Sequence, residues 1–242
     1  MSGNIGNRTT DIVRDGLVFN IDPANLYSYR HLKSGSTIKD TVNNVNGTIN
    51  GAAFLNLSSI TGGYFNFDGT DDYMGFGDVL DLGVLSVSMW ISCDVYDSGR
   101  QFLFGKWKNS HRAYALVLNQ SGTSAGSITS QISIDGGSSN VGLVTDSGAI
   151  DANGPWNNVG FTHDGTTLKT YVNGVKGATT TIGEAYTSGT GHVAVGTILF
   201  SNDTSPLDPF NGQIQGVQVY NRALSASEVL QNYNGLKGRF GL

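Results

Sequence analysis

Short segments in which apolar and polar residues alternate, separated by glycine-rich turns, constrain the fold of this chain most. Phe65 and Phe67 alternate with the more polar Tyr64 and Asn66, and the apolar residues at 87, 89 and 91 alternate with Ser86, Ser88 and Trp90. Such a period of two places successive side chains on opposite faces of a strand. The 242 residues include 34 glycines and only four prolines, a composition that suits tight turns between strands. The sequence therefore predicts an all-β chain of about 12–14 short strands in two stacked antiparallel sheets.

Two local signals refine this prediction. Asn173-Gly174 lies between two apolar runs and fits the two-residue type I′ turn of a β-hairpin. Further on, the alternation changes phase across Gly216. The apolar residue before it lies at the even position 214, whereas the apolar residues after it, Val217 and Val219, lie at odd positions. An extra residue at a glycine predicts a β-bulge in this strand.

One short C-terminal helix is predicted. Ser225 and Glu228 have the spacing of a capping box, in which each side chain accepts from the backbone N–H of the other residue. Val229 and Tyr233 give the helix an apolar side, and Gly235 is expected to end it. We therefore divide the chain into an N-terminal arm at 1–15, one domain at 16–235 and a C-terminal tail at 236–242.

Several motifs occur in an order that is typical of one fold family. Because of them the chain resembles the laminin-G-like domain of the concanavalin A-like lectin/glucanase superfamily over residues 16–234. This resemblance implies a two-sheet antiparallel jelly-roll sandwich. The motifs are Phe-Asn-Phe-Asp-Gly-Thr-Asp-Asp-Tyr at 65–73, Val-Ser-Met-Trp-Ile at 87–91, Gly-Pro-Trp-Asn-Asn-Val at 154–159, Phe-Thr-His-Asp-Gly at 161–165, Tyr-Val-Asn-Gly at 171–174, Val-Ala-Val-Gly at 193–196, Phe-Asn-Gly-Gln-Ile at 210–214 and Val-Gln-Val-Tyr-Asn-Arg-Ala-Leu-Ser at 217–225.

The charge and hydropathy of the chain exclude two classes of partner. The formal net charge is -5 and only 14% of residues are charged, so there is no basic footprint for nucleic acid. No segment approaches the roughly 18 consecutive apolar residues of a membrane span. We therefore expect neither nucleic-acid binding nor membrane insertion.

The small number of glutamates argues against a glycosidase. Glycosidases of the superfamily use two glutamates from one strand, in a Glu-x-Asp-x-x-Glu or similar pattern, and a retaining mechanism needs the two carboxyls about 5–5.5 Å apart. This chain has only Glu184 and Glu228, and the second is assigned to the capping box. The sequence thus predicts a non-enzymatic protein without a catalytic residue.

The resemblance implies calcium and glycan binding at the rim of a sheet. Calcium prefers oxygen ligands, and the acidic loops contain Asp71 and Asp72 as one candidate pair and Asp203 and Asp208 as another. The alternative for the first pair is a turn without metal, because Asp-Gly-Thr-Asp-Asp at 68–72 is a good turn sequence.

Glycans stack on exposed aromatic rings. Trp107 lies between two lysines, and Tyr186 lies in a loop rich in glycine, serine and threonine. We therefore take these two residues as the candidate glycan-binding residues. Trp90 and Trp156 lie in the strand motifs, and core packing is expected for both.

Three features favour a role in a virus particle. Met1–Asn4 do not begin an apolar signal-peptide segment, Cys93 is a lone cysteine, and the opening at 16–25 and the tail at 236–242 are similar to laminin-G-like structural proteins of tailed phages. The prediction is a virion structural protein, as a capsid decoration or a tail or fibre component, that contacts other virion proteins and copies of itself and mediates adhesion to cell-surface glycans. The alternative is a lectin-like carbohydrate-binding module of a bacterium, extracellular or at the cell surface.

Overall fold

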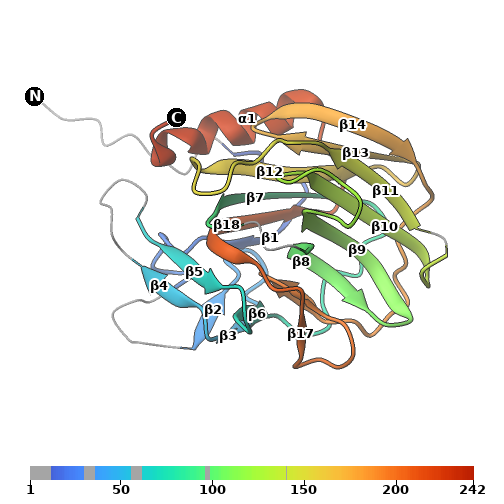
Figure 1. Cartoon of the computed structure of the whole chain (residues 1–242), viewed down its shortest axis with the longest axis horizontal. Helices are drawn as coiled ribbons and strands as arrows, with labels where there is room; N and C mark the ends of the chain where they lie inside the picture. Colours follow the sequence, from blue (N-terminus) through green and yellow to red (C-terminus); the bar gives the residue numbers. More distant parts are fainter. Residues whose placement is uncertain (1–11, 30–35, 56–61, 96–98, 140) are drawn as a thin grey trace, which may run out of the picture.

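Two antiparallel sheets stack face to face in the computed structural model, and one helix lies along the outside of the first sheet (Figure 1). The structure describes residues 12–29, 36–55, 62–95, 99–139 and 141–242. The predicted all-β sandwich with one short C-terminal helix is confirmed.

The first sheet has the strand order β14-β13-β12-β7-β18-β5-β4. β1 also pairs with β18, along the second half of that strand, whereas β5 pairs with its first half. The strands are β1 (Leu17–Ile21), β4 (Ala53–Leu55), β5 (Tyr64–Asp68), β7 (Leu85–Cys93), β12 (Asn157–His163), β13 (Thr167–Val172), β14 (Val175–Thr181) and β18 (Asn211–Tyr220).

The second sheet has the order β11-β10-β9-β8-β15-β6-β3-β2, and a separate small hairpin, β16 with β17, accompanies it. The strands are β2 (Thr37–Lys39), β3 (Asn46–Asn50), β6 (Tyr73–Gly75), β8 (Gln101–Lys108), β9 (His111–Leu118), β10 (Ile128–Gly136), β11 (Val141–Asp146), β15 (Val193–Val195), β16 (Ile198–Leu199) and β17 (Pro206–Leu207).

The main hydrophobic core fills the space between the two sheets. Met89 and Ile91 of β7 and Leu116 of β9 are all fully buried there. Alternation explains why: every second residue of each strand faces the opposite sheet, while the residues between face outward. In β9, Ala115 and Val117 accordingly belong to a separate apolar cluster on the outer face.

The predicted hairpin and bulge are both confirmed. Asn173 and Gly174 have φ angles of 51° and 76° and connect β13 to β14, as a type I′ turn requires. The register of β18 against β7 shifts between Gln215 and Val217, and Gly216 there has a φ of 75°. Glycine adopts this left-handed conformation without steric cost.

Helix α1 (Ala226–Lys237) begins with the predicted capping box but runs beyond its predicted end. The expectation that Gly235 stops the helix is wrong. Leu236 is buried, and after the short 3-10 turn η2 (Gly238–Phe240) the ring of Phe240 stacks on Trp90 at a centroid distance of 4.0 Å. These contacts offset the roughly 1 kcal/mol cost of a glycine within a helix. None of the helices in the described residues has the length and apolar character of a membrane span.

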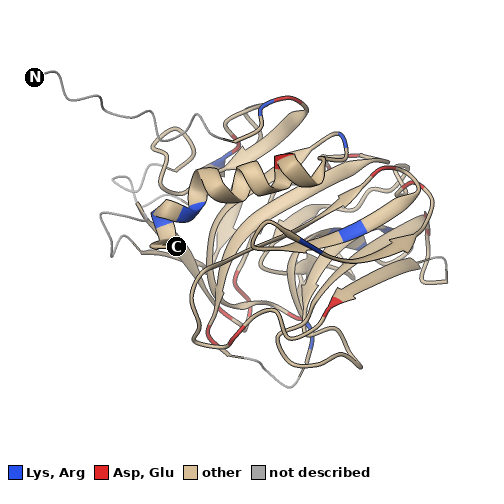
Figure 2. Cartoon of the chain, turned by 90° about the horizontal axis from the view of Figure 1, so that it is seen from above, with Lys and Arg blue, Asp and Glu red and all other residues tan. Residues whose placement is uncertain are grey.

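Both ends of the described chain lie on the sandwich. Val13 is buried beside α1, and its backbone N–H donates to Asn232 Oδ1 at 2.7 Å. Arg239 pairs with Asp22 at 3.0 Å. Residues 1–11 of the predicted arm lie outside the described residues. Positions 12–15 and 236–242 therefore complete the outer layer of the first sheet, where Figure 2 shows the helix crossing the strands.

We predict that Glu228→Gln destabilises the protein near neutral pH. Arg222 donates to both oxygens of Glu228, at 3.0 and 2.6 Å, and the Ser225 N–H donates at 2.8 Å. These bonds lower the pKa of Glu228 from 4.5 to about 2. A carboxylate with a lowered folded-state pKa stabilises the fold above its unfolded pKa, and that contribution is lost as the pH falls toward 2.

The free energy of unfolding should therefore fall by about 1 kcal/mol at pH 7, as for loss of a helix cap, and the difference from wild type should shrink below pH 4.5. Urea unfolding between pH 3 and 7 measures this. The exposed Glu184→Gln is the matched control. An equal loss at every pH would contradict the assigned role of the charge.

Candidate functional site

A cavity of about 300 Å³ opens on the outer face of the second sheet, and we call it the hairpin hollow. Strands β8 to β11 and the loops that follow β9 and β10 form its base, and the β16–β17 hairpin forms one wall. Aromatic, aliphatic, amide and guanidinium groups line it together. The lining residues are Arg100, Phe102, Trp107, Arg112, Gln120, Gln131, Ser138, Val141, Leu143, Ile198, Phe200 and Leu207.

One threonine closes the base of the hairpin, and two backbone hydrogen bonds then fix the hairpin to β8 and to the turn after it. Thr197 Oγ1 donates to the Leu207 carbonyl at 2.9 Å and accepts from the Leu207 N–H at 3.0 Å. The N–H of Phe102 donates to the Asp208 carbonyl at 2.9 Å, and that of Asn109 donates to the Phe200 carbonyl at 2.8 Å. Ile198 then packs on the outward side chains of β8 and β9. The hollow is therefore a built feature with a fixed wall.

Planar side chains define the polar part of the hollow. Gln131 Nε2 donates to Gln120 Oε1 at 2.7 Å. Arg112 pairs across the strands with Trp107, and its guanidinium lies 5.9 Å from the Trp107 ring centroid and 5.2 Å from that of Phe200. A concave site with aromatic walls and a few amide and guanidinium groups suits a ligand that has both apolar faces and hydroxyl groups.

The structure places the two predicted glycan residues apart. Trp107 lines the hollow, but only 7% of its surface is exposed, because it packs in the cluster of Phe102 and Ile198. Tyr186 is half-buried beside Gly136, and its N–H donates to the Ser133 carbonyl at 2.8 Å. It is not among the residues that line the hollow.

The other two tryptophans lie at the opposite sheet. Trp90 is buried, as expected, but beneath Tyr233 and Phe240 on the outer face of the first sheet rather than between the sheets. Trp156 is half-buried, 5.0 Å from the Phe240 ring centroid. Both therefore hold the C-terminal helix and η2 in place.

Sequence reasoning missed the residues that complete the hollow. Phe200, Arg112 and the glutamine pair have no motif in common. The alternation in β9 and β10 could have indicated that Arg112 and Gln131 face outward. No sequence signal indicates that the β16–β17 hairpin brings Phe200 over them, because that placement is a tertiary contact.

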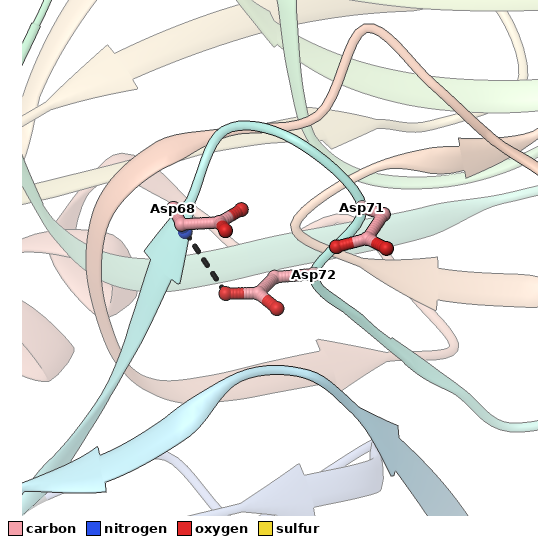
Figure 3. A group of neighbouring side chains, drawn as sticks. All are labelled: Asp68, Asp71 and Asp72. Atoms are coloured by element: carbon pink, nitrogen blue, oxygen red, sulfur yellow. Dashed lines mark hydrogen bonds between the residues drawn. The ribbon is translucent and has the colours of Figure 1, made fainter.

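The four predicted metal-ligating aspartates separate into two kinds. Asp71 and Asp72 gather with Asp68 at the turn between β5 and β6, with carboxylate oxygens within 4.8 Å of one another (Figure 3). Asp203 instead pairs with Lys108 at 3.0 Å, and Asp208 pairs with Arg100 at 2.5 Å. The structure thus brings together only the first predicted pair, in a group with Asp68.

The three clustered carboxylates fit a hard cation such as calcium. Burial raises the pKa of Asp72, and the charges of Asp68 and Asp71 raise it further, against a lowering by the hydrogen bond from the Asp68 N–H. This bond, 2.9 Å long, occupies one oxygen of Asp72, and the Thr70 N–H donates to Asp68 Oδ1 at 2.7 Å. The other carboxylate oxygens of the three aspartates could serve as ligands. A cation among them would offset the mutual repulsion.

We predict that Asp71→Asn raises the melting temperature slightly in calcium-free buffer at pH 7. Because the pKa of Asp72 is raised in the folded protein, the fold loses stability when Asp72 ionises as the pH rises. The substitution removes the Asp71 charge that repels ionised Asp72, so part of this loss should be recovered. Millimolar calcium, the range of weak extracellular sites, should raise the melting temperature of the wild type more than that of Asp71→Asn. Differential scanning fluorimetry measures both. An identical calcium response in the two proteins would contradict a site at this cluster.

Comparison with known protein families gives one match. A profile described as the concanavalin A-like lectin/glucanases superfamily matches residues 68–230. This range includes the turn with Asp71 and Asp72, the hairpin hollow and the start of α1. No sequence among curated proteins matches the chain.

Solved structures share the fold at low sequence identity. Domain 4 of AbnA, an extracellular GH43 arabinanase from Geobacillus stearothermophilus solved with arabinotriose, has a TM-score of 0.66 at 20% identity, over 91% of this chain and 100% of that chain. The binding domain of botulinum neurotoxin DC in complex with SialylT has a TM-score of 0.65 at 12% identity, over 92% and 52%.

A mutant Trypanosoma rangeli sialidase with trans-sialidase activity has a TM-score of 0.64 at 14% identity, over 93% of this chain and 33% of that chain. The chain thus spans about half of the toxin structure and a third of the sialidase. At these identities the likeness shows the fold alone.

Proposed function

The chain belongs to the concanavalin A-like lectin/glucanase superfamily, and from this premise we propose that it is a non-enzymatic domain that binds glycans in the hairpin hollow. The observation that carries the proposal is the composition of the hollow. The half-buried Phe200 and the largely buried Trp107 line it together with the amides of Gln120 and Gln131.

This combination matches the chemistry of a sugar. The C–H face of a pyranose packs on aromatic rings, while its hydroxyls need donors and acceptors at fixed positions. Two proteins with the same fold were solved with saccharide-related ligands, namely the arabinanase domain with arabinotriose and the toxin domain with SialylT. These complexes support the proposal by analogy of fold, which alone does not assign a function.

The carboxylates support binding without hydrolysis. Among the described residues that line the hollow there is no aspartate or glutamate. Glu228 is held by Arg222 at the start of α1, on the other sheet, and Glu184 is an exposed residue outside the lining. Glycoside hydrolysis by the retaining mechanism needs two carboxyls about 5–5.5 Å apart across the scissile bond. We therefore propose a lectin-like role and not a glycoside hydrolase.

We also propose that the domain serves as an adhesion component of a virus particle, as a capsid decoration or in a tail or fibre. The similarity of residues 16–25 and 236–242 to laminin-G-like phage structural proteins favours this role. Many copies on one particle would convert weak glycan contacts into firm attachment through effective concentration. A bacterial carbohydrate-binding module is the alternative, and it would use the same hollow.

We predict that Phe200→Ala weakens glycan binding about tenfold, since it removes an aromatic contact worth roughly 1 kcal/mol or more. A glycan array identifies the ligands, and isothermal titration calorimetry then compares the dissociation constants. Trp107→Ala should also abolish retention, but its side chain is buried, so thermal denaturation must first show that this variant folds.

The matched control is Tyr27→Ala, which removes an aromatic ring that is 82% exposed and does not line the hollow. Its affinity should equal that of the wild type. An array without signal for the folded protein, or unchanged affinity in Phe200→Ala, would contradict binding in the hollow.

The particle role predicts that the chain is found in purified virions from an infected host culture. Quantitative mass spectrometry of the particles measures its copy number. Hundreds of copies would indicate capsid decoration, and low tens or fewer would indicate a tail or fibre. Absence from the particles would overturn this role and leave the bacterial module.

A further inference from the structure

We propose that the hairpin hollow selects acidic glycans, and that Arg112 binds the carboxylate of a uronic or sialic acid residue. The inference rests on the proposed glycan-binding function and adds the chemical class of the ligand. It depends on three properties of Arg112, namely its fixed position, its lack of an anionic partner and the neutral groups around it.

Arg112 is held in place by two aromatic rings. It is half-buried near the start of β9, directly across from Trp107 of β8. Its guanidinium carbon lies 5.9 Å from the Trp107 ring centroid and 5.2 Å from that of Phe200. Guanidinium groups stack on aromatic faces and keep their N–H groups available at the edge of the plane. The cation is thus oriented before any ligand arrives.

Arg112 differs from the neighbouring cations in its charge balance. Arg100, at the same hollow, pairs with Asp208, and Lys108 pairs with Asp203. The buried Lys106 contacts two aspartates. Within the described part of the chain no ion pair includes Arg112, and its Nε is buried without a hydrogen-bond partner. The hydrogen-bonding capacity of the Arg112 guanidinium is therefore not used up within the described fold, and its exposed N–H groups remain available to a ligand.

The complementary group is a carboxylate. A guanidinium has five N–H donors and no acceptor, and two parallel N–H···O bonds to a planar carboxylate satisfy it best. Gln120, Gln131 and Ser138 supply neutral partners for hydroxyl groups nearby, and Leu143, which is 48% exposed, supplies an apolar surface. A volume of about 300 Å³ lies at the lower limit for small-molecule sites. It suits one acidic sugar at a chain end better than a long polymer.

The first test needs only the wild-type protein. Calorimetry compares trigalacturonate with its neutral methyl ester, and sialyllactose with lactose. We expect the acidic member of at least one pair to bind ten times more tightly or better, and its affinity to fall with added salt because charge pairing is screened. The two pairs distinguish uronate from sialate as the source of the carboxylate.

The second test removes the cation. Arg112→Gln should weaken binding of the preferred acidic sugar about tenfold to hundredfold, the range for hydrogen bonds to charged groups. Binding of the neutral counterpart should change by less than the acidic one. Arg112→Lys keeps the charge but loses the bidentate geometry, so it should fall between wild type and Arg112→Gln. It also serves as the folded variant if Arg112→Gln is unstable.

Lys176→Gln is the matched control, because it removes one positive charge from an exposed residue of β14 in the other sheet. Its affinity should equal that of the wild type. Equal affinity for acidic and neutral sugars, or unchanged acidic binding in Arg112→Gln, would overturn the role of Arg112 while leaving glycan binding intact. If neither sugar of any pair binds, and the glycan array is also silent, the proposed function itself fails.

Discussion

The pairing of β18 is the constraint on which the rest of the structure depends. One edge of this strand hydrogen-bonds to β7, and the other bonds to β5 and then to β1. Residues from the beginning, middle and end of the chain therefore meet at one strand near the C-terminus. Such pairing between distant segments requires long loops to close, and the chain loses entropy before the stabilising contacts form. Assembly of the sandwich is therefore expected to be slow but cooperative.

The hairpin hollow follows from the way in which the chain reaches β18. β15 belongs to the second sheet and β18 to the first, so residues 196–210 must cross between them. The crossing segment does not take the direct route but folds into the β16–β17 hairpin over β8 and β9. It covers apolar outward residues such as Val117 and leaves Arg112 and Phe200 at the border of an open space. The candidate binding site is thus a consequence of the connection between the two sheets.

The two outer faces of the sandwich are consequently covered to different extents. On the first sheet, α1 and η2 cover Trp90, and residues 12–15 lie beside them, so that the chain itself covers much of this face. A cavity of about 220 Å³ remains between these residues, β1 and the end of α1. On the second sheet the small hairpin covers only part of the face. Phe200 and Gln120 there are only half-buried, and so is Arg112, a cation that has no anionic partner among the described residues. This asymmetry is why we locate ligand binding on the second sheet.

The sequence by itself determined the features that depend on neighbouring residues. Alternation specified the strands, Asn173-Gly174 the hairpin, Gly216 the bulge and the Ser225–Glu228 pair the start of the helix, since each results from contacts within a few positions. Only the tertiary structure decided that the helix passes Gly235, that Trp107 is mostly covered, that Asp203 and Asp208 pair with cations, and that Phe200 meets Arg112. Those outcomes depend on which distant segments pack together, and alternation fixes the face of a strand without fixing what covers it.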